Sequence, residues 1–450
     1  MYKFFKYFIP FYTFFLLACA NHSSDNLIYT QTILSNSCSD SFFEKEKKKI
    51  DNLEDPIYVG INVASIARYC NKFELSNEIF DKTEDAYKFD VDLKDGASKT
   101  LKAIGTTLTN DSLADYDGTL YERIMLNIYK GLNFMSLRDF ENARVEFNRA
   151  LYRQDRAKEY FAKDIAELRK EFDEQKQNKK DIESGIDKVS SQYEHLLREF
   201  KTSQNFINPY ATYISSVFFF LERDYSKAAD LFKEIAVTHS NNAEIKKEFN
   251  VFNQYANSSS PEKLKKYIFV VYENGLGAGL YEMSFTIPYS FNDSIITTSF
   301  ALPVLKARPS SFHYIKAGDK RTVEVANFDD IIATEFKILL PAKIFKAIVS
   351  SISKTAVNMV VSNNAGGWAA LASSIINSAT TRADVRYWSS LPKNAQVLMI
   401  ENNGYIELTD NMGGLLYKND NIDKSKNTLL ILRSFSVNST NLTYLIQEDR

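Results

Sequence analysis

This sequence has few cysteines, few histidines and no large excess of one charge, and each of these features argues against a class of function. Only 3 cysteines and 4 histidines occur in 450 residues. The histidines have no neighbours at metal-ligand spacing; they are His22, His195, His239 and His313. Lys and Arg number 55 against 57 Asp and Glu, so no basic excess favours nucleic acid as a partner. We therefore expect no metal, no cofactor and no nucleic-acid partner, and no small-molecule ligand is assigned.

Long apolar runs are also missing, apart from a short one at the amino terminus. Lys3 and Lys6 precede the apolar stretch from Tyr7 to Leu17, which contains Pro10. A helix that spans a bilayer needs ~20 apolar residues, and this stretch is well short of that length. A basic start followed by a short apolar run and small residues is typical of an export signal. The sequence therefore predicts a signal peptide over residues 1–18.

The end of this signal resembles a lipobox. The residues are Leu16-Leu17-Ala18-Cys19. In the lipobox of bacterial lipoproteins, the cysteine thiol receives a diacylglyceryl group before the peptide bond on its amino side is cut. The resemblance implies acylation of Cys19 and a membrane anchor. Ala20, in place of the aspartate that retains many lipoproteins in the inner membrane, implies the outer membrane, facing the periplasm. The alternative is cleavage at Ala18-Cys19-Ala20 as an ordinary A-x-A site, which would release a soluble periplasmic protein.

Two further cysteines, Cys38 and Cys70, leave two alternatives open. In an oxidising periplasm they would form a disulfide, and otherwise they would be two separate buried thiols. Residues 19–55 are polar and end in a charged run from Glu44 to Lys49. This composition predicts an acylated cysteine followed by a flexible polar tether.

Residues 56–256 have a helical and repetitive pattern. One unit fits the spacing of the tetratricopeptide template, with small residues where two helices cross and aromatic residues that fill the gap between them: Gly131, Phe134, Phe140, Ala143, Phe147 and Ala150. A second unit has Phe219, Tyr225, Ala228 and Phe232 at the same offsets, and a weaker third has Phe73, Ser76 and Phe80. We predict helical repeats whose framework residues support a protein-binding surface.

The repeats are interrupted by an insert over residues 155–201. Apolar residues alternate there in steps of three and four, at Phe161, Ile165, Leu168 and Phe172 and then from Ile182 to Phe200. Polar residues fall in the middle of this pattern. One long helix is an alternative, but a helical hairpin that folds back near Gln177-Asn178 and packs on the repeats is favoured.

The sequence changes character at Asn257 to Pro261, the predicted domain boundary. Short segments rich in β-branched and aromatic residues predict strands at 267–272, 282–287, 294–301, 322–326, 396–401, 405–408, 428–435 and 442–446. Between them a helical segment is expected over 328–384, with Pro341 in the first turn of one of its helices and a further helix over 367–384. Residues 262–450 are thus predicted to form an α+β domain after an all-α domain.

Two motifs in the second half contain residue types that can carry chemistry. Gly275, Gly277 and Gly279 follow a strand but lack the spacing of a nucleotide loop, which favours a hairpin turn. Asp384, Arg386 and Trp388 are functional side-chain types in one short stretch, Ala383 to Pro392. The alternative to a functional role is a helix end at 384–386 with the tryptophan in the core. No catalytic residue is assigned.

Several stretches together resemble a family of bacterial periplasmic lipoproteins with tetratricopeptide-like repeats. They are 116–118 with 121–123, 137–144, 208–211, 272–275, 383–388 and 391–392. Lys130, where the template has Leu, and Asp155, where it has Pro, depart from the repeat pattern. The resemblance implies a lipid anchor, helical repeats and a carboxy-terminal part without an assigned activity.

We therefore expect a membrane-anchored protein-binding scaffold in a cell-envelope assembly, with other envelope proteins as partners. Two alternatives are an envelope enzyme with activity in the carboxy-terminal domain and a membrane-active or pore component. The second would use residues 342–384, because residues 355–381 contain no charged side chain.

Overall fold

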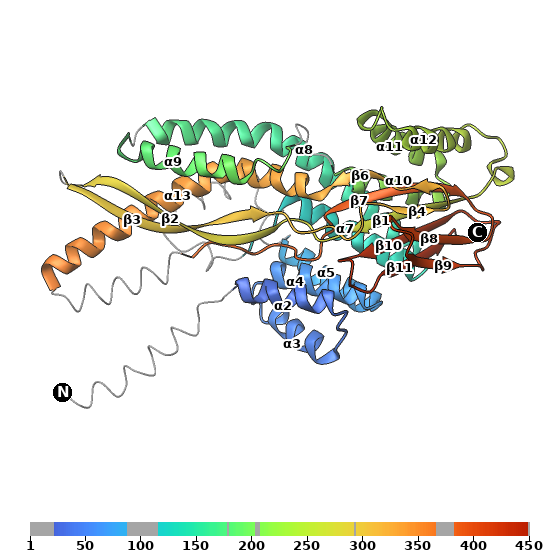
Figure 1. The fold of residues 1–450 in the computed structure, drawn as a ribbon, viewed down its shortest axis with the longest axis horizontal. Coiled ribbons are helices and arrows are strands. Elements are labelled where there is room, and N and C mark those ends of the chain that lie inside the picture. Colours follow the sequence, from blue (N-terminus) through green and yellow to red (C-terminus); the bar gives the residue numbers. More distant parts are fainter. Residues whose placement is uncertain are drawn as a thin grey trace.

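The computed structural model describes residues 22–87, 116–177, 180–202, 208–291, 294–365 and 382–448, with side chains described except at 160–182, 289–296 and 354–365. Helices fill the described part of the chain up to residue 256, and strands with one long helix follow (Figure 1). The predicted α+β class is confirmed. Cys19 and the predicted signal peptide lie outside the described residues. Within the described ranges, no helix has both the length and the apolar character needed to cross a membrane.

The predicted tether is wrong, because the chain is folded from residue 22 onward. Helix α2 (His22–Leu34) and helix α3 (Asp40–Asp51) occupy most of its length. Their inward faces bury apolar side chains at helical spacing, which are Tyr29 and Ile33 on α2 and Phe43 and Ile50 on α3. These side chains join the main hydrophobic core, so α2 and α3 are part of the folded body.

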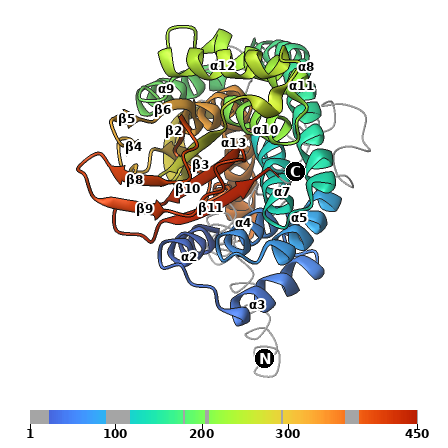
Figure 2. The ribbon, with the colours of Figure 1, turned by 90° about the vertical axis from the view of Figure 1, so that its right-hand side faces the viewer.

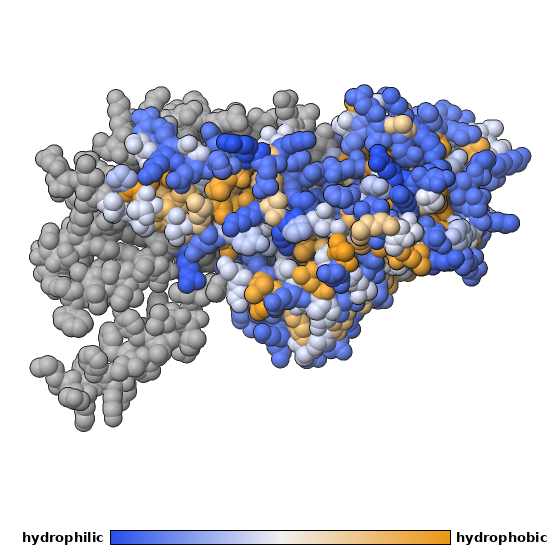
Figure 3. Space-filling model, viewed as in Figure 1, coloured by the Kyte–Doolittle hydropathy of each residue, from blue (hydrophilic) through white to orange (hydrophobic). Residues whose placement is uncertain are grey.

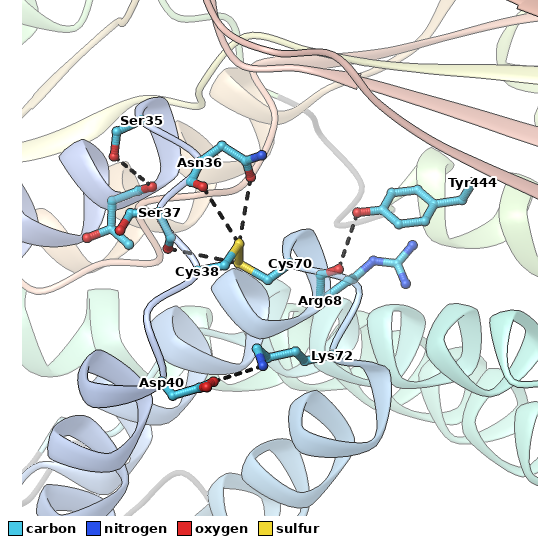
Figure 4. The surroundings of a disulfide bond; sticks show 10 residues. Ser35, Asn36, Ser37, Cys38, Asp40, Arg68, Cys70, Lys72 and Tyr444 are labelled. Carbon is cyan, nitrogen blue, oxygen red and sulfur yellow. Dashed lines mark hydrogen bonds and ion pairs between the residues drawn. A yellow bond between two sulfur atoms is a disulfide. The ribbon is translucent and has the colours of Figure 1, made fainter.

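A disulfide joins the two cysteines for which the sequence left two alternatives. Cys38 lies between α2 and α3, and Cys70 follows helix α4 (Pro56–Tyr69) (Figure 4). An ion pair between Lys72 and Asp40 at 2.9 Å links the same two parts of the chain. The connection between α2 and α3 is therefore fastened to the carboxyl end of α4.

Three helix hairpins follow, and their turns share one geometry. They are α4 with α5 (Phe73–Tyr87), α7 (Leu120–Ser136) with α8 (Phe140–Gln177), and α10 (Pro209–Leu221) with α11 (Tyr225–Thr238). In each turn the middle residue has a positive φ, 57° at Asn71, 64° at Arg138 and 66° at Arg223. The next residue donates its N–H to the carbonyl five residues earlier in all three turns, the pattern that ends a helix with a left-handed residue.

The predicted insert is the long end of α8 together with α9 (Lys180–Leu196). The two helices contact each other, which corresponds to the fold-back arrangement rather than to one long helix. Tyr193 of α9 is buried, stacks on Phe285 at 5.5 Å and donates its hydroxyl to the carbonyl of Pro303. The α9 part of the insert thus packs on the second half of the chain, while Lys158 near the start of the insert pairs with Glu234 of α11 at 3.3 Å. Its predicted apolar residues from Phe161 to Ile182 have no described side chains.

The second half contains two stacked sheets. The larger has the order β11-β10-β1-β7-β6, and the smaller has the order β5-β4-β8-β9. Strand β1 pairs parallel with β10 and antiparallel with β7. The larger sheet consists of β1 (Tyr267–Asn274), β6 (Val323–Asn327), β7 (Asn394–Glu401), β10 (Thr428–Ser434) and β11 (Leu442–Gln447), and the smaller of β4 (Ile315–Ala317), β5 (Lys320–Arg321), β8 (Ile406–Asp410) and β9 (Leu415–Asn419). The short strands β4 and β5 and strand β9 were not predicted.

A long two-stranded ribbon and a long helix extend to one side of these sheets (Figure 1). The ribbon is β2 (Gly279–Phe291) paired with β3 (Ser294–Lys306), and the helix is α13 (Phe328–Ala365). The three-glycine segment therefore connects the sheet to the ribbon, and the predicted hairpin turn is wrong because β1 and β2 do not pair. Pro341 lies inside α13 rather than at the start of a new helix.

The helix predicted over 367–384 falls mostly outside the described residues. Its last part, at 382–384, is described and is not helical. Earlier in the chain, α12 (Ala243–Ala256) closes the helical half, and a short 3₁₀ helix (Pro261–Lys263) lies at the predicted boundary. Both halves contribute to one hydrophobic core, in which Phe220 of α10 and Phe252 of α12 pack on Phe269 of β1.

Candidate functional site

The residues of the first predicted repeat unit lie where two helices cross closely. A Cβ atom added at Gly131 on α7 would come within 2.9 Å of the Phe147 ring on α8, so a larger residue there would force this ring to move. Phe147 stacks on Phe218 of α10 at 4.5 Å. The other members of the unit are buried or half-buried between the helices: Phe134, Phe140, Ala143 and Ala150. They hold the hairpin together and are not themselves an exposed binding surface.

The second predicted unit has the same character. Phe219, Ala228 and Phe232 are buried between α10 and α11, while Tyr225 is half-buried beside Phe220 at 5.2 Å. Ser216 donates its hydroxyl to the carbonyl of Ala228 at 2.8 Å. In the first hairpin the equivalent pair of positions is bonded in the opposite direction, since Ser76 of the second helix donates to the carbonyl of Ala64 on the first at 2.7 Å.

A buried charge cluster explains why Lys130 departs from the repeat template. Its ammonium lies 2.7 Å from Asp81, 2.9 Å from Glu84 and 3.0 Å from Glu146. Arg153 pairs with Glu84 at 2.9 Å. Burial would raise the pKa of Glu84, but the charges of Lys130 and Arg153 outweigh it and lower the pKa to about 2. The cluster thus holds α5, α7 and α8 together, and its charged groups form ion pairs with one another.

The inner face of the helix hairpins is covered by the protein's own sheet. Figure 2 shows the helices arranged around the strands. In each hairpin the first helix touches the sheet side: Tyr69 of α4 packs on Phe435 at 4.9 Å, Tyr129 of α7 on Trp388 at 5.7 Å, and Phe220 of α10 on Phe269 at 5.2 Å. In the first hairpin the second helix, α5, also reaches this side, where Phe80 lies beside Trp388 at 5.9 Å and Phe73 beside Tyr444 at 6.0 Å. A partner peptide therefore has no access to this inner face in the structure.

The stretch from Ala383 to Pro392 runs between the helices and the sheet, and its polar side chains are engaged there. Arg386 is buried and pairs with Asp384 and with Asp55, each at 2.9 Å. Burial would raise the pKa of Asp384, but its bidentate hydrogen bonds to the Arg386 guanidinium lower it below the ordinary value. The predicted helix end at 384–386 is wrong, because the segment is not helical.

Trp388 is in the core, as the alternative interpretation of this stretch expected. Its indole N–H donates to Ser65 at 2.7 Å, and its backbone N–H donates to Glu122 at 3.0 Å. Asn62 of α4 accepts hydrogen bonds from the backbone N–H and the hydroxyl of Ser389. Asp384, Arg386 and Trp388 thus join the two halves of the chain, and the polar groups of all three are engaged in these contacts.

Two carboxylates meet at the amino end of α7. Glu335 of α13 accepts the backbone N–H groups of Leu120 and Tyr121, and Glu122 closes a capping box with Thr119. Burial raises the pKa of Glu335 to about 7 and also raises that of Glu122. Hydrogen bonds from the helix end favour the charged form of each group. These residues position the helix rather than form an open site.

The sequence did not point to the polar residues that connect the helices to the second half of the chain, which are Asn62, Ser65, Glu122 and Glu335. A signal existed for two of them, because Asn62 and Ser65 interrupt the otherwise apolar α4 at adjacent turns of one face. In the described ranges, no group of three or more His, Cys, Asp or Glu side chains is placed to hold a metal ion.

The membrane-active alternative concerned residues 342–384. Ile344 and Ile348 of α13 are buried, and Ser351 donates its hydroxyl to the carbonyl of Ser299 on β3. One side of the early part of this segment is therefore packed against the rest of the protein. The uncharged part from residue 355 to 381 has no described side chains.

Comparison with known protein families, with characterised proteins and with solved structures gives no match to this chain.

Proposed function

We propose that this chain is a lipoprotein of the bacterial outer membrane, held by acyl chains on Cys19 and facing the periplasm. The order of basic, apolar and small residues before Cys19 carries this proposal. The disulfide between Cys38 and Cys70 supports it, because disulfides persist in oxidising compartments such as the periplasm. Replacing Cys19 with Ala should abolish labelling by a radioactive fatty acid, and normal labelling of that variant would contradict the proposal.

We infer further that the protein is a scaffold in a cell-envelope assembly, built on tetratricopeptide-like repeats. Three helix hairpins with the same turn geometry support this inference. Their left-handed residues are 67 and 85 residues apart, at Asn71, Arg138 and Arg223. The first interval is close to two periods of about 34 residues. The second interval contains the α8–α9 insert.

Because the sheet covers the inner face of the hairpins, the proposed partner surface lies on their outer helices. The outer side of α8 presents Val145 and Tyr152, which are 44% and 66% exposed. Arg149 and Arg156 lie on the same side at helical spacing. Tyr and Arg side chains are enriched where proteins bind one another.

The experiment is copurification from crosslinked envelopes with the acylated full-length chain. Val145→Ser with Tyr152→Ser should lose the proteins that copurify with the wild type, since it removes the apolar part of the proposed surface. Val237→Ser is the matched control, because Val237 is 69% exposed but lies on α11. Equal recovery of partners by both variants would contradict the α8 surface, and an absence of any specific partner would contradict the scaffold.

A further inference from the structure

The outward face of α2 has exposed apolar side chains, and the one acidic residue of the helix, Asp25, is half-buried at 32% exposure. Leu27, Ile28 and Leu34 are 56%, 42% and 39% exposed. The other exposed residues of this helical face and of its carboxyl end are small or amide side chains: Ser23, Ser24, Gln31 and Ser35. By contrast, the neighbouring α3 exposes the charged residues Glu44, Lys45 and Lys48. A helix face in water normally has charges among its polar residues, so the outward face of α2 is suited to a less polar environment than water.

The start of α2 is close in the chain to the proposed anchor. Helix α2 begins at His22, three residues after Cys19. Three residues span at most ~11 Å even when fully extended. An acyl anchor on Cys19 would therefore hold the first turn of α2 within about the depth of a lipid headgroup layer, since the headgroups extend a bilayer from ~30 to ~45 Å in thickness.

Helix α2 is also fixed to the body of the protein at both ends. Near its start, Asn26 donates to the carbonyl of Val385 and accepts from the Tyr58 hydroxyl, each at 2.7 Å. After its end, Cys38 is bonded to Cys70. The helix therefore does not swing on a tether, and the face that it turns outward is set by the fold.

We propose that this outward face of α2 lies in the headgroup layer of the leaflet that holds the acyl chains, with Leu27, Ile28 and Leu34 inserted beside them. Figure 3 shows hydrophobic residues at the surface over α2. Helices with one apolar face bury it at the boundary of headgroups and acyl chains. Helix α2 contains no Lys or Arg, so it would bind through apolar insertion, and its partner is the lipid surface itself and not an anionic headgroup. This inference rests on the proposed acylation of Cys19.

The experiment places a tryptophan at the proposed contact in the acylated full-length chain. Leu27→Trp and Leu34→Trp are each reconstituted in phosphatidylethanolamine vesicles that contain a phosphatidylcholine brominated in its acyl chains, which quenches tryptophan at short range. Val237→Trp is the matched control, because α11 lies on the opposite side of the molecule from α2 (Figures 1 and 2). The fluorescence of the parent chain is subtracted, and mass spectrometry of each chain records the acyl groups.

At positions 27 and 34 we expect at least about twofold stronger quenching than at position 237, with or without added phosphatidylglycerol. All three positions are exposed, so the substitutions should leave the fold intact, which circular dichroism checks. An acylated chain that is quenched equally at all three positions overturns the inference and leaves the lipoprotein proposal standing. Quenching at 27 and 34 only with phosphatidylglycerol also overturns it, because contact would then depend on charge. A chain without acyl mass overturns both.

Discussion

Glu248 offers a sharp test of the packing between α10 and α12. Its side chain is fully buried, and Tyr213 of α10 donates its hydroxyl to one carboxyl oxygen at 2.9 Å. The other oxygen has no hydrogen-bond partner among the described residues. Burial raises the pKa of Glu248 to about 8, although the hydrogen bond from Tyr213 lowers it. The carboxyl group should therefore be protonated in the folded protein at neutral pH.

The sign of the effect follows from comparing the folded and unfolded chains. The pKa of Glu248 is about 8 in the folded protein against an ordinary value of 4.5, so the folded state binds the proton more tightly. Its stabilising contribution is complete below pH ~4.5 and is lost as the pH rises to ~8. One pKa unit corresponds to 1.36 kcal/mol, so the loss over this range should be about 3–5 kcal/mol.

Glu248→Gln should remove this loss, because glutamine accepts the Tyr213 hydrogen bond without taking up a proton. The free energy of unfolding is measured by urea denaturation of the mature chain in mild detergent, followed by circular dichroism at several pH values from 5 to 9. The variant should gain about 3–5 kcal/mol over the wild type at pH 8 relative to pH 5. Other buried carboxyls affect both chains equally, so the difference isolates Glu248.

The matched control for this prediction is Glu141→Gln. Glu141 is exposed on α8, so its replacement should change the unfolding free energy by the same small amount at every pH. A difference between Glu248→Gln and wild type that stays constant from pH 5 to pH 9 would refute the protonated buried carboxyl.

Three further predictions concern the helix hairpins, the disulfide and the boundary between the two halves. Ala143→Trp should lower the free energy of unfolding by about 1–3 kcal/mol or more, because Ala143 is fully buried, and an unchanged thermal melt would refute the close helix crossing. Replacing both Cys38 and Cys70 by Ser should cost about 3–4 kcal/mol in urea denaturation, since the bond spans 32 residues. Limited proteolysis near 257–261 should nick the chain, but gel filtration should recover the two pieces together because they share one core. Separate elution of two folded pieces would support independent domains instead.

Local patterns predicted much of the secondary structure. The spacing of Phe140, Ala143 and Phe147 belongs to one helix, so the sequence alone contained the information that α8 needs. Most of the predicted strands also occur within a few residues of their observed bounds, because β-branched and aromatic runs favour strands wherever they pair. The one continuous α13 was missed because Pro341 normally disfavours a helix interior by ~3 kcal/mol, which packing on both sides of it outweighs.

The helices α2 and α3 were missed although their signal was present. Tyr29 and Ile33 are four residues apart, and Phe43 and Ile50 are seven apart, both spacings that place side chains on one helix face. The charged run that ends with Lys49 hid this pattern, because a high content of polar residues is also typical of a disordered tether. Two short helices become stable here because α4 supplies the surface on which they pack and the disulfide fixes the connection between them.

The covered inner face of the helix hairpins could not be predicted, because it depends on contacts between residues far apart in the sequence. Strand β1 pairs with β10 about 160 residues later, and Asn62 meets Ser389 across 327 residues. A repeat pattern predicts that its helices stack, but it does not tell whether the face they form stays open or receives another part of the chain. Here the buried Asn62, Ser65 and Glu122 indicate the answer, since each would lose a hydrogen bond if the stretch around Trp388 were removed. Buried polar residues on an otherwise apolar repeat face therefore indicate an inner face filled from within the chain, and they direct the search for partners to the outside of the helices.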